Sequence, residues 1–141
     1  MPVTDYIKTT ENLLAVFTSK LTTAQPTWTI RTYSGSGYED LFKMIPELDA
    51  LTNPVAIVIY SGSDYKNDPR RTARVSVMVV RENAGDVEAE KITARAMLDS
   101  VLAALDEHID GTVFIRAVSD SSADLGEGLA AYIVEFEALD R

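Results

Sequence analysis

The stretch that decides the fold is Val55-Ala56-Ile57-Val58-Ile59-Tyr60, six consecutive residues without a charged side chain. Four of the six are β-branched, and such residues favour an extended strand. Apolar side chains occupy both alternating sets of positions, and turn residues bound the run. We therefore expect a strand that is buried on both faces or central in its sheet.

Two other segments near this strand also show a strand pattern. Residues 72–81 return to it after a polar loop at 62–69, so we expect the two strands to form a long hairpin. Residues 27–33 alternate with period two and are rich in β-branched and aromatic side chains, which predicts a strand with one solvated face.

The C-terminal part of the chain predicts two more strands, at residues 112–118 and 129–139, with a loop at 119–128 between them. The last strand alternates regularly, so one of its sides is expected to be core and the other partly exposed. The side expected to face the core comprises Tyr132, Val134, Phe136 and Ala138.

Two segments have helical periodicity. Residues 4–21 predict an amphipathic helix, with Thr4 or Asp5 as its N-cap. The second apolar stripe runs over residues 87–109, and Gly111 is placed to act as the C′ residue after that helix.

The order of elements indicates one domain over residues 1–141. Residues 38–51, around Pro46, are expected to form a connecting segment rather than a long helix. The sequence has no internal repeat, low-complexity tract or linker. It predicts an α+β fold, with a mainly antiparallel sheet of about four to five strands and two main helices packed against it.

The composition excludes several classes of function. The 141 residues include 13 Lys+Arg, 22 Asp+Glu, one His and no Cys, for a net charge of −9. A chain without cysteine has no disulfide framework, thiolate nucleophile or iron–sulfur ligands, and one histidine is too few for most catalytic zinc sites. The negative charge disfavours nucleic-acid binding. The sequence shows no membrane span or signal-peptide pattern, so we expect synthesis inside the cell.

Candidate chemical sites in the sequence are weak. Asp120, Asp124 and Glu127 offer oxygen ligands to a hard cation, but their spacing does not fit a calcium loop, and a solvated hairpin loop is favoured. Asp64 and Asp68 beside basic residues suggest phosphoryl chemistry, but loop solvation or pairing with a neighbouring copy is favoured. We expect no catalytic, cofactor-binding or metal-binding residue.

The single histidine, His108, falls in the last turn of the second predicted helix. A cation there complements the helix dipole, so we expect a capping or surface role rather than catalysis.

Taken together, several features resemble the tail terminator (tail completion) proteins of long-tailed phages and prophages, including Mu-like ones. The resemblance spans residues 6–139. It is carried by the order of elements, the apolar strand at 54–60, the Asp68-Pro69 step into the strand at 73–80, the long helix and the closing strand at 132–136.

This resemblance implies a structural protein without enzymatic activity or cofactor. The subunit would form a homo-oligomer, a hexameric ring that caps the tail tube, ends its polymerisation and forms the head-joining surface. Its partners would be the tail tube protein and a head-closure or neck protein, with DNA passing through the lumen without specific binding and with no membrane contact. It would be assembled in the host bacterial cytoplasm and reside in the virion tail.

Charge distribution suggests how such a ring could form. A closing ring needs two different complementary surfaces on each subunit, and residues 71–141 carry 14 acidic against 7 basic groups. We expect the basic region at 66–74 to contact the acidic C-terminal half of a neighbour. The expected interface residues are Lys66, Arg70, Arg71, Arg74, Asp120, Asp124, Glu127, Glu135 and Glu137.

Other functions remain open at this level. One is a head-closure or neck component. Another is a non-viral ligand-binding or regulatory α+β module with a pocket between sheet and helix. A third is a small metal-dependent hydrolase that uses Asp64 and Asp68, or Asp120 and Asp124.

Overall fold

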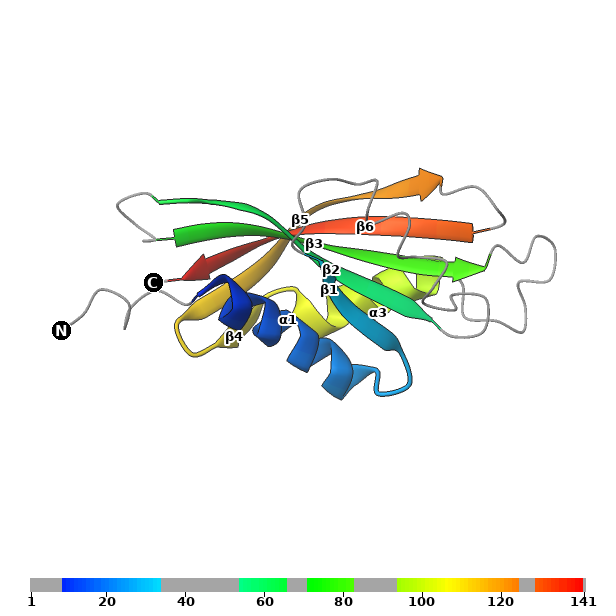
Figure 1. The fold of residues 1–141 in the computed structure, drawn as a ribbon, viewed down its shortest axis with the longest axis horizontal. Helices are drawn as coiled ribbons and strands as arrows, with labels where there is room; N and C mark the ends of the chain where they lie inside the picture. The colour runs from blue at the N-terminus through cyan, green and yellow to red at the C-terminus, as the bar shows by residue number, and fades with distance from the viewer. Residues whose placement is uncertain (1–8, 34–53, 66–70, 83–93, 125–128, 141) are drawn as a thin grey trace.

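The described part of the protein is a six-stranded sheet with two helices on one side (Figure 1). The computed structural model describes residues 9–33, 54–65, 71–82, 94–124 and 129–140. The elements are α1 (Thr10–Ala24), β1 (Thr29–Tyr33), β2 (Val55–Asp64), β3 (Arg71–Glu82), α3 (Ala94–Leu105), β4 (His108–Asp110), β5 (Val113–Asp124) and β6 (Leu129–Asp140). The predicted connecting segment at 38–51 lies outside the described residues.

The sheet has the strand order β1-β2-β3-β6-β5-β4. Four long strands, β2, β3, β6 and β5, pair in antiparallel fashion, and β1 joins β2 in parallel. The predicted α+β class and mainly antiparallel sheet are therefore confirmed. The strand count is six rather than four to five, because β4 forms a short edge strand that the sequence pattern did not indicate.

The prediction that the strand at 55–60 is buried on both faces is also confirmed. All five residues from Val55 to Ile59 are buried, because the helices cover one side of β2 and a second apolar cluster surrounds its other side. β2 continues to Asp64, past the predicted end, through a bulge between Tyr60 and Gly62. Gly62 has a φ of +120°, a conformation that side chains with a Cβ rarely adopt.

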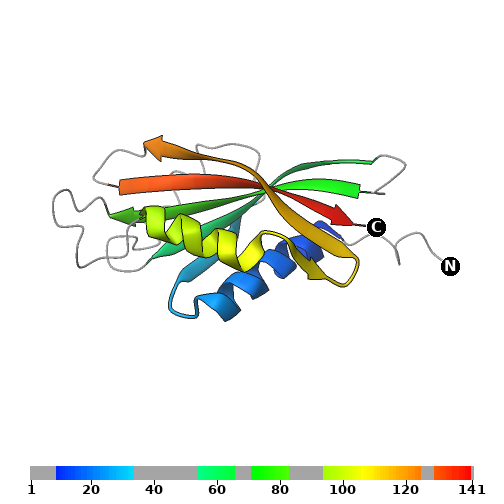
Figure 2. The ribbon, with the colours of Figure 1, turned by 180° about the vertical axis from the view of Figure 1, so that it is seen from behind.

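The main core lies between the sheet and the two helices, which remain on the same side when the molecule is turned (Figure 2). α1 packs over β1 and β2, while α3 packs over β3, β6 and β5. The predicted core side of β6 is confirmed, since Val134, Phe136 and Ala138 are buried in this cluster and Tyr132 packs against it.

The first helix starts later than the sequence predicts. Thr9 is its N-cap, and the Thr9 hydroxyl accepts a hydrogen bond of 3.2 Å from the backbone N–H of Asn12. The predicted caps Thr4 and Asp5 lie outside the described residues. The helix ends at Ala24, shortly before Pro26.

The predicted end of the second helix is wrong. α3 stops at Leu105, and Glu107 takes the left-handed conformation with a φ of 60°, which turns the chain into β4. Ile109 pairs with Phe114 across the sheet and is 68% exposed, so it does not belong to the helical stripe. Gly111, with a φ of 59°, belongs to the β4–β5 turn rather than to the helix end.

The predicted loop at 119–128 is also shorter than expected. Ser119 to Asp124 continue β5 and pair with β6, after a bulge between Ala117 and Ser119. Backbone pairing with a long neighbouring strand holds these polar residues extended, although serine and aspartate have low strand propensity on their own.

Candidate assembly surface

The face of the sheet away from α1 and α3, here called the outer face, has two unlike halves. One half carries a buried apolar cluster of Val55, Ile57, Ile59, Met78, Val80 and Ala131. At the other end of the same strands the outward positions are charged or partly exposed. The exposed half is the part of the face that can meet another molecule.

Four charged side chains lie next to one another on this exposed half. Arg74 on β3 is directly opposite Glu137 on β6, which in turn is opposite Arg116 on β5. On β2, Gly62 is opposite Arg74 and Asp64 is opposite Thr72, but the Asp64 side chain reaches Arg74, with 3.4 Å between Oδ2 and Nη1. We call Asp64, Arg74, Glu137 and Arg116 the charged row.

The contacts within the charged row are exposed ion pairs. Nε and Nη2 of Arg116 both donate to Oε2 of Glu137, at 3.0 and 2.8 Å. The side chains of Arg74, Asp64 and Arg116 are 55%, 53% and 54% exposed, and that of Glu137 is 29% exposed. Exposed pairs of this kind stabilise a fold little, by about 0 to 1 kcal/mol, so their charges remain able to interact with a partner.

A second row on the outer face is apolar. Ile109 pairs with Phe114, Phe114 with Leu139, Leu139 with Thr72, and Thr72 with Asp64, so five strands contribute one line of side chains. Ile109 is 68% exposed, and Phe114, Leu139 and Thr72 are half-buried. We call Ile109, Phe114 and Leu139 the apolar row. It lies beside the charged row and adds apolar area to the same surface.

Arg71, one of the expected interface residues, is buried inside the subunit and only 3% exposed. Its Nε donates to Ser63 Oγ at 3.0 Å, and its Nη2 donates to Thr10 Oγ1 at 2.9 Å and to Tyr60 Oη at 3.4 Å. The guanidinium carbon also lies 5.8 Å from the ring centres of Tyr60 and Tyr65. Arg71 therefore links the start of α1 to the β2–β3 end of the sheet, and we remove it from the interface set.

Two other ionisable residues, Asp140 and Tyr60, lie next to Arg71. Asp140 is fully buried, lies directly opposite Arg71 across β3 and β6, and accepts a hydrogen bond of 2.7 Å from Thr112 Oγ1. Burial by itself raises the pKa of Tyr60, but the hydrogen bonds with Ser63 and Arg71 and the charge of Arg71 outweigh it, so the pKa lies below its usual range. These hydrogen bonds and the adjacent cation stabilise the phenolate more than water does around an exposed tyrosine.

Two further expected interface residues whose side chains the structure describes, Glu135 and Asp120, lie on opposite faces of the sheet. Glu135 is exposed on the outer face and accepts a hydrogen bond of 3.2 Å from Ser119 Oγ, while Asp120 is exposed on β5 opposite buried Val134. Asp124 is the last residue of β5. The other three, Lys66, Arg70 and Glu127, lie outside the described residues.

Sequence reasoning missed Arg116 and did not separate Arg71 from Arg74. The alternation that leads back from Val75 through Ala73 to Arg71 was the available signal for its burial, since residues two apart share a face. No such local signal exists for Arg116, because its neighbours in the charged row come from other strands.

The described residues hold no group of three or more His, Cys, Asp or Glu side chains that could bind a metal ion. Asp64 is paired with Arg74, and Asp68 lies outside the described part. His108 Nε2 is 3.1 Å from the carbonyl oxygen of Ala103, in the last turn of α3. His108 is the first residue of β4, so its predicted position in the last turn of the helix is wrong.

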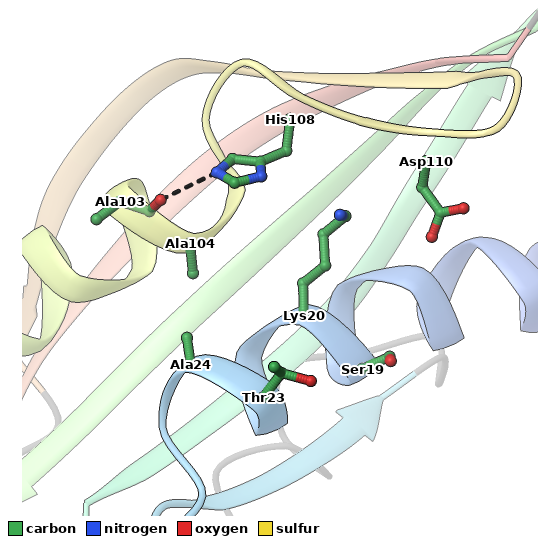
Figure 3. A pocket seen from close by; sticks show the side chains of 8 residues that line it. All are labelled: Ser19, Lys20, Thr23, Ala24, Ala103, Ala104, His108 and Asp110. Carbon is green, nitrogen blue, oxygen red and sulfur yellow. Dashed lines mark hydrogen bonds between the residues drawn. The ribbon is translucent and has the colours of Figure 1, made fainter.

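A hollow of about 490 Å³ lies between α1, α3 and β4 (Figure 3). In the close view the Lys20 side chain extends from α1 toward His108 and Asp110. The lining residues are Ser19, Lys20, Thr23, Ala24, Ala103, Ala104, His108 and Asp110. Most of them are exposed, so the hollow is an open surface groove rather than a closed cavity.

Neither described helix is long and apolar enough to cross a membrane. Comparison with known proteins adds no assignment: no family model matches this chain, and no curated protein matches it.

Proposed function

We propose that this chain is a structural subunit of a phage tail, a tail terminator that forms a hexameric ring on the tube, ends its polymerisation and provides the surface to which the head joins. The proposal starts from the sequence resemblance. Its support in the structure is the character of the two sheet edges, together with the overall charge.

The observation that carries the proposal is the difference between the two sheet edges. Among the described strands, β1 pairs with β2 alone, and Arg31 on β1 is exposed. At the other edge, β5 beyond Ile115 pairs, among the same strands, with β6 alone, and Asp120 is exposed there. One edge therefore presents the cation Arg31. At the other edge Arg116 is paired with Glu137, and Asp120 adds an exposed anion.

Different edges suit a ring. A ring closes when one surface of each subunit binds a different surface of the next. Unpaired strand edges offer backbone hydrogen-bonding groups to a partner strand, and opposite charges on the two edges favour this pairing over contacts between like edges. In the ring, β1 of one subunit lies against the free part of β5 of its neighbour.

The charge of the subunit fits a passage for DNA. At a net charge of −9, a ring of six copies repels the phosphate backbone rather than binding it. DNA can then move through the lumen without being retained.

Negative-stain microscopy and native mass spectrometry of the purified chain test the proposal. We expect a six-membered ring, and tubes of finite length with a ring at one end when the tube protein is added. Asp120→Arg and Arg31→Asp should each reduce ring formation, because each brings like charges together at the edge contact. Asp99→Arg, an exposed position on α3, is the matched control. A subunit that remains single even with tube protein contradicts the proposal.

A second candidate function rests on the hollow between α1, α3 and β4. Its volume of about 490 Å³ is suitable for a small ligand, and Lys20, His108 and Asp110 supply polar groups. This would make the chain a ligand-binding module. A small-molecule screen by thermal shift distinguishes the two, because a ligand that binds only the native state raises the melting temperature. A Lys20→Ala variant should abolish such a shift.

A further inference from the structure

We propose that two copies of this chain pair face to face through the exposed half of the outer face, with the charged row of one copy against the charged row of the other. The pairing uses a face of the sheet, whereas the ring proposed above uses its edges. It therefore does not rest on that function.

The order of charges carries the inference. Across β3, β6 and β5 the charged row reads positive, negative, positive, as Arg74, Glu137 and Arg116. Asp64 on β2 brings its carboxylate to 3.4 Å from Arg74, although its own strand position is opposite Thr72. The two central residues, Arg74 and Glu137, exchange signs when the row is reversed. This pair is complementary to itself when a second copy is rotated by a two-fold axis.

The geometry of a two-fold pair fixes which residues meet. An axis parallel to the strands and between β3 and β6 reverses the row of the second copy. Arg74 then faces Glu137 of the second copy, and Glu137 faces Arg74 of it. A two-fold interface of this kind uses one patch on both partners, as most homodimers do.

The row is accessible and held in place. Arg74, Asp64 and Arg116 are each more than half exposed, and paired strands fix their spacing at about 4.8 Å per strand. Two sheets can pack through their faces with strands roughly aligned. The apolar row beside the charges supplies area to remove from water, while the charges set the register and exclude wrong partners.

The size of the patch sets the expected strength. A stable dimer commonly buries about 800 Å² on each partner, which is more than two rows on four strands provide. We therefore expect weak, reversible pairing, with a dissociation constant on the order of micromolar or weaker. Pairing should weaken as salt is added, because exposed charges are screened.

Sedimentation equilibrium of the full chain over a range of concentrations tests the pairing. Arg74→Glu and Glu137→Arg should each weaken association by about tenfold or more, since each places like charges opposite one another at both contacts. An equimolar mixture of the two variants should restore it. In the mixed pair the new carboxylate faces the new guanidinium, and the unchanged Arg74 and Glu137 face each other.

Asp99→Arg and Arg95→Glu make the same changes in charge on α3, on the other side of the sheet, and should leave association unchanged. Circular dichroism melts show whether each variant is folded. Two results overturn the pairing: association of both single variants equal to that of the unmodified chain, or no restoration in the mixture. If six-membered rings form normally but the mixture of the two variants does not associate, the pairing is contradicted and the tail function is not. If the mixture associates but no rings form, the tail function alone is contradicted.

Discussion

Phe17 on α1 and Phe136 on β6 meet edge to face, with ring centres 5.9 Å apart and planes at 67°. Both side chains are buried, and the contact joins the first helix to a central strand. This geometry is the favourable one for two aromatic rings, since the positive edge of one meets the negative face of the other.

Replacing Phe136 with alanine should reduce the free energy of unfolding by about 3–5 kcal/mol, because it leaves a cavity in the main core. Urea unfolding of the two single variants, Phe17→Ala and Phe136→Ala, and of the double variant measures their coupling. We expect about 0.5–1.5 kcal/mol between the rings. A loss below about 1 kcal/mol for Phe136→Ala would be inconsistent with a buried position.

Arg71 and Arg74, three residues apart on β3, should respond differently to truncation. Arg71→Ala leaves the hydroxyls of Ser63, Thr10 and Tyr60 without the guanidinium inside the subunit and should cost about 1–3 kcal/mol of unfolding free energy. Arg74→Ala removes an exposed pair and should cost about 1 kcal/mol or less. Equal losses in chemical denaturation would contradict the assignment of Arg71 to the interior.

The lowered pKa of Tyr60 predicts a pH dependence of stability. The folded state releases the Tyr60 proton more readily than the unfolded chain does. The stabilisation that this ionisation gives the fold is therefore complete above the unfolded pKa of about 10, and it is lost as the pH falls through the lower pKa of the folded state. The unmodified chain should therefore gain stability relative to Tyr60→Phe as pH approaches 10. In an absorbance titration of tyrosine ionisation, the step with the lowest pKa should be missing in Tyr60→Phe.

The left-handed residue after α3 offers a stabilising substitution. Glu107 has a φ of 60°, which costs a residue with a Cβ about 1 kcal/mol. Glu107→Gly should raise the melting temperature, whereas Gly111→Ala, at a φ of 59°, should lower it. A Cβ added at Gly111 would meet no atom within 4 Å, so backbone strain alone would explain the loss. If calorimetry shows that the two substitutions do not change the melting temperature in opposite directions, this backbone conformation is contradicted.

Local pattern was sufficient for five of the six described strands, apart from the polar end of β5, and for the class of fold. The apolar run at Val55–Ile59 and the alternation through Val134 and Phe136 placed β2 and β6 and predicted the correct inward side of β6. These features depend on residues two apart, whose relation is set by the geometry of an extended chain. The polar end of β5 and the short β4 were missed because partner strands, rather than their own propensity, hold them extended.

What the sequence by itself determined is therefore the α+β class, the composition that excludes thiol chemistry, and the core side of the main strands. Only the tertiary structure decided that Arg71 lies inside while Arg74 lies outside, and that Arg74, Glu137 and Arg116 are neighbours. The reason is that strand register joins residues far apart in the chain. A shift of one position would turn every side chain to the opposite face, and no short stretch of sequence contains that information.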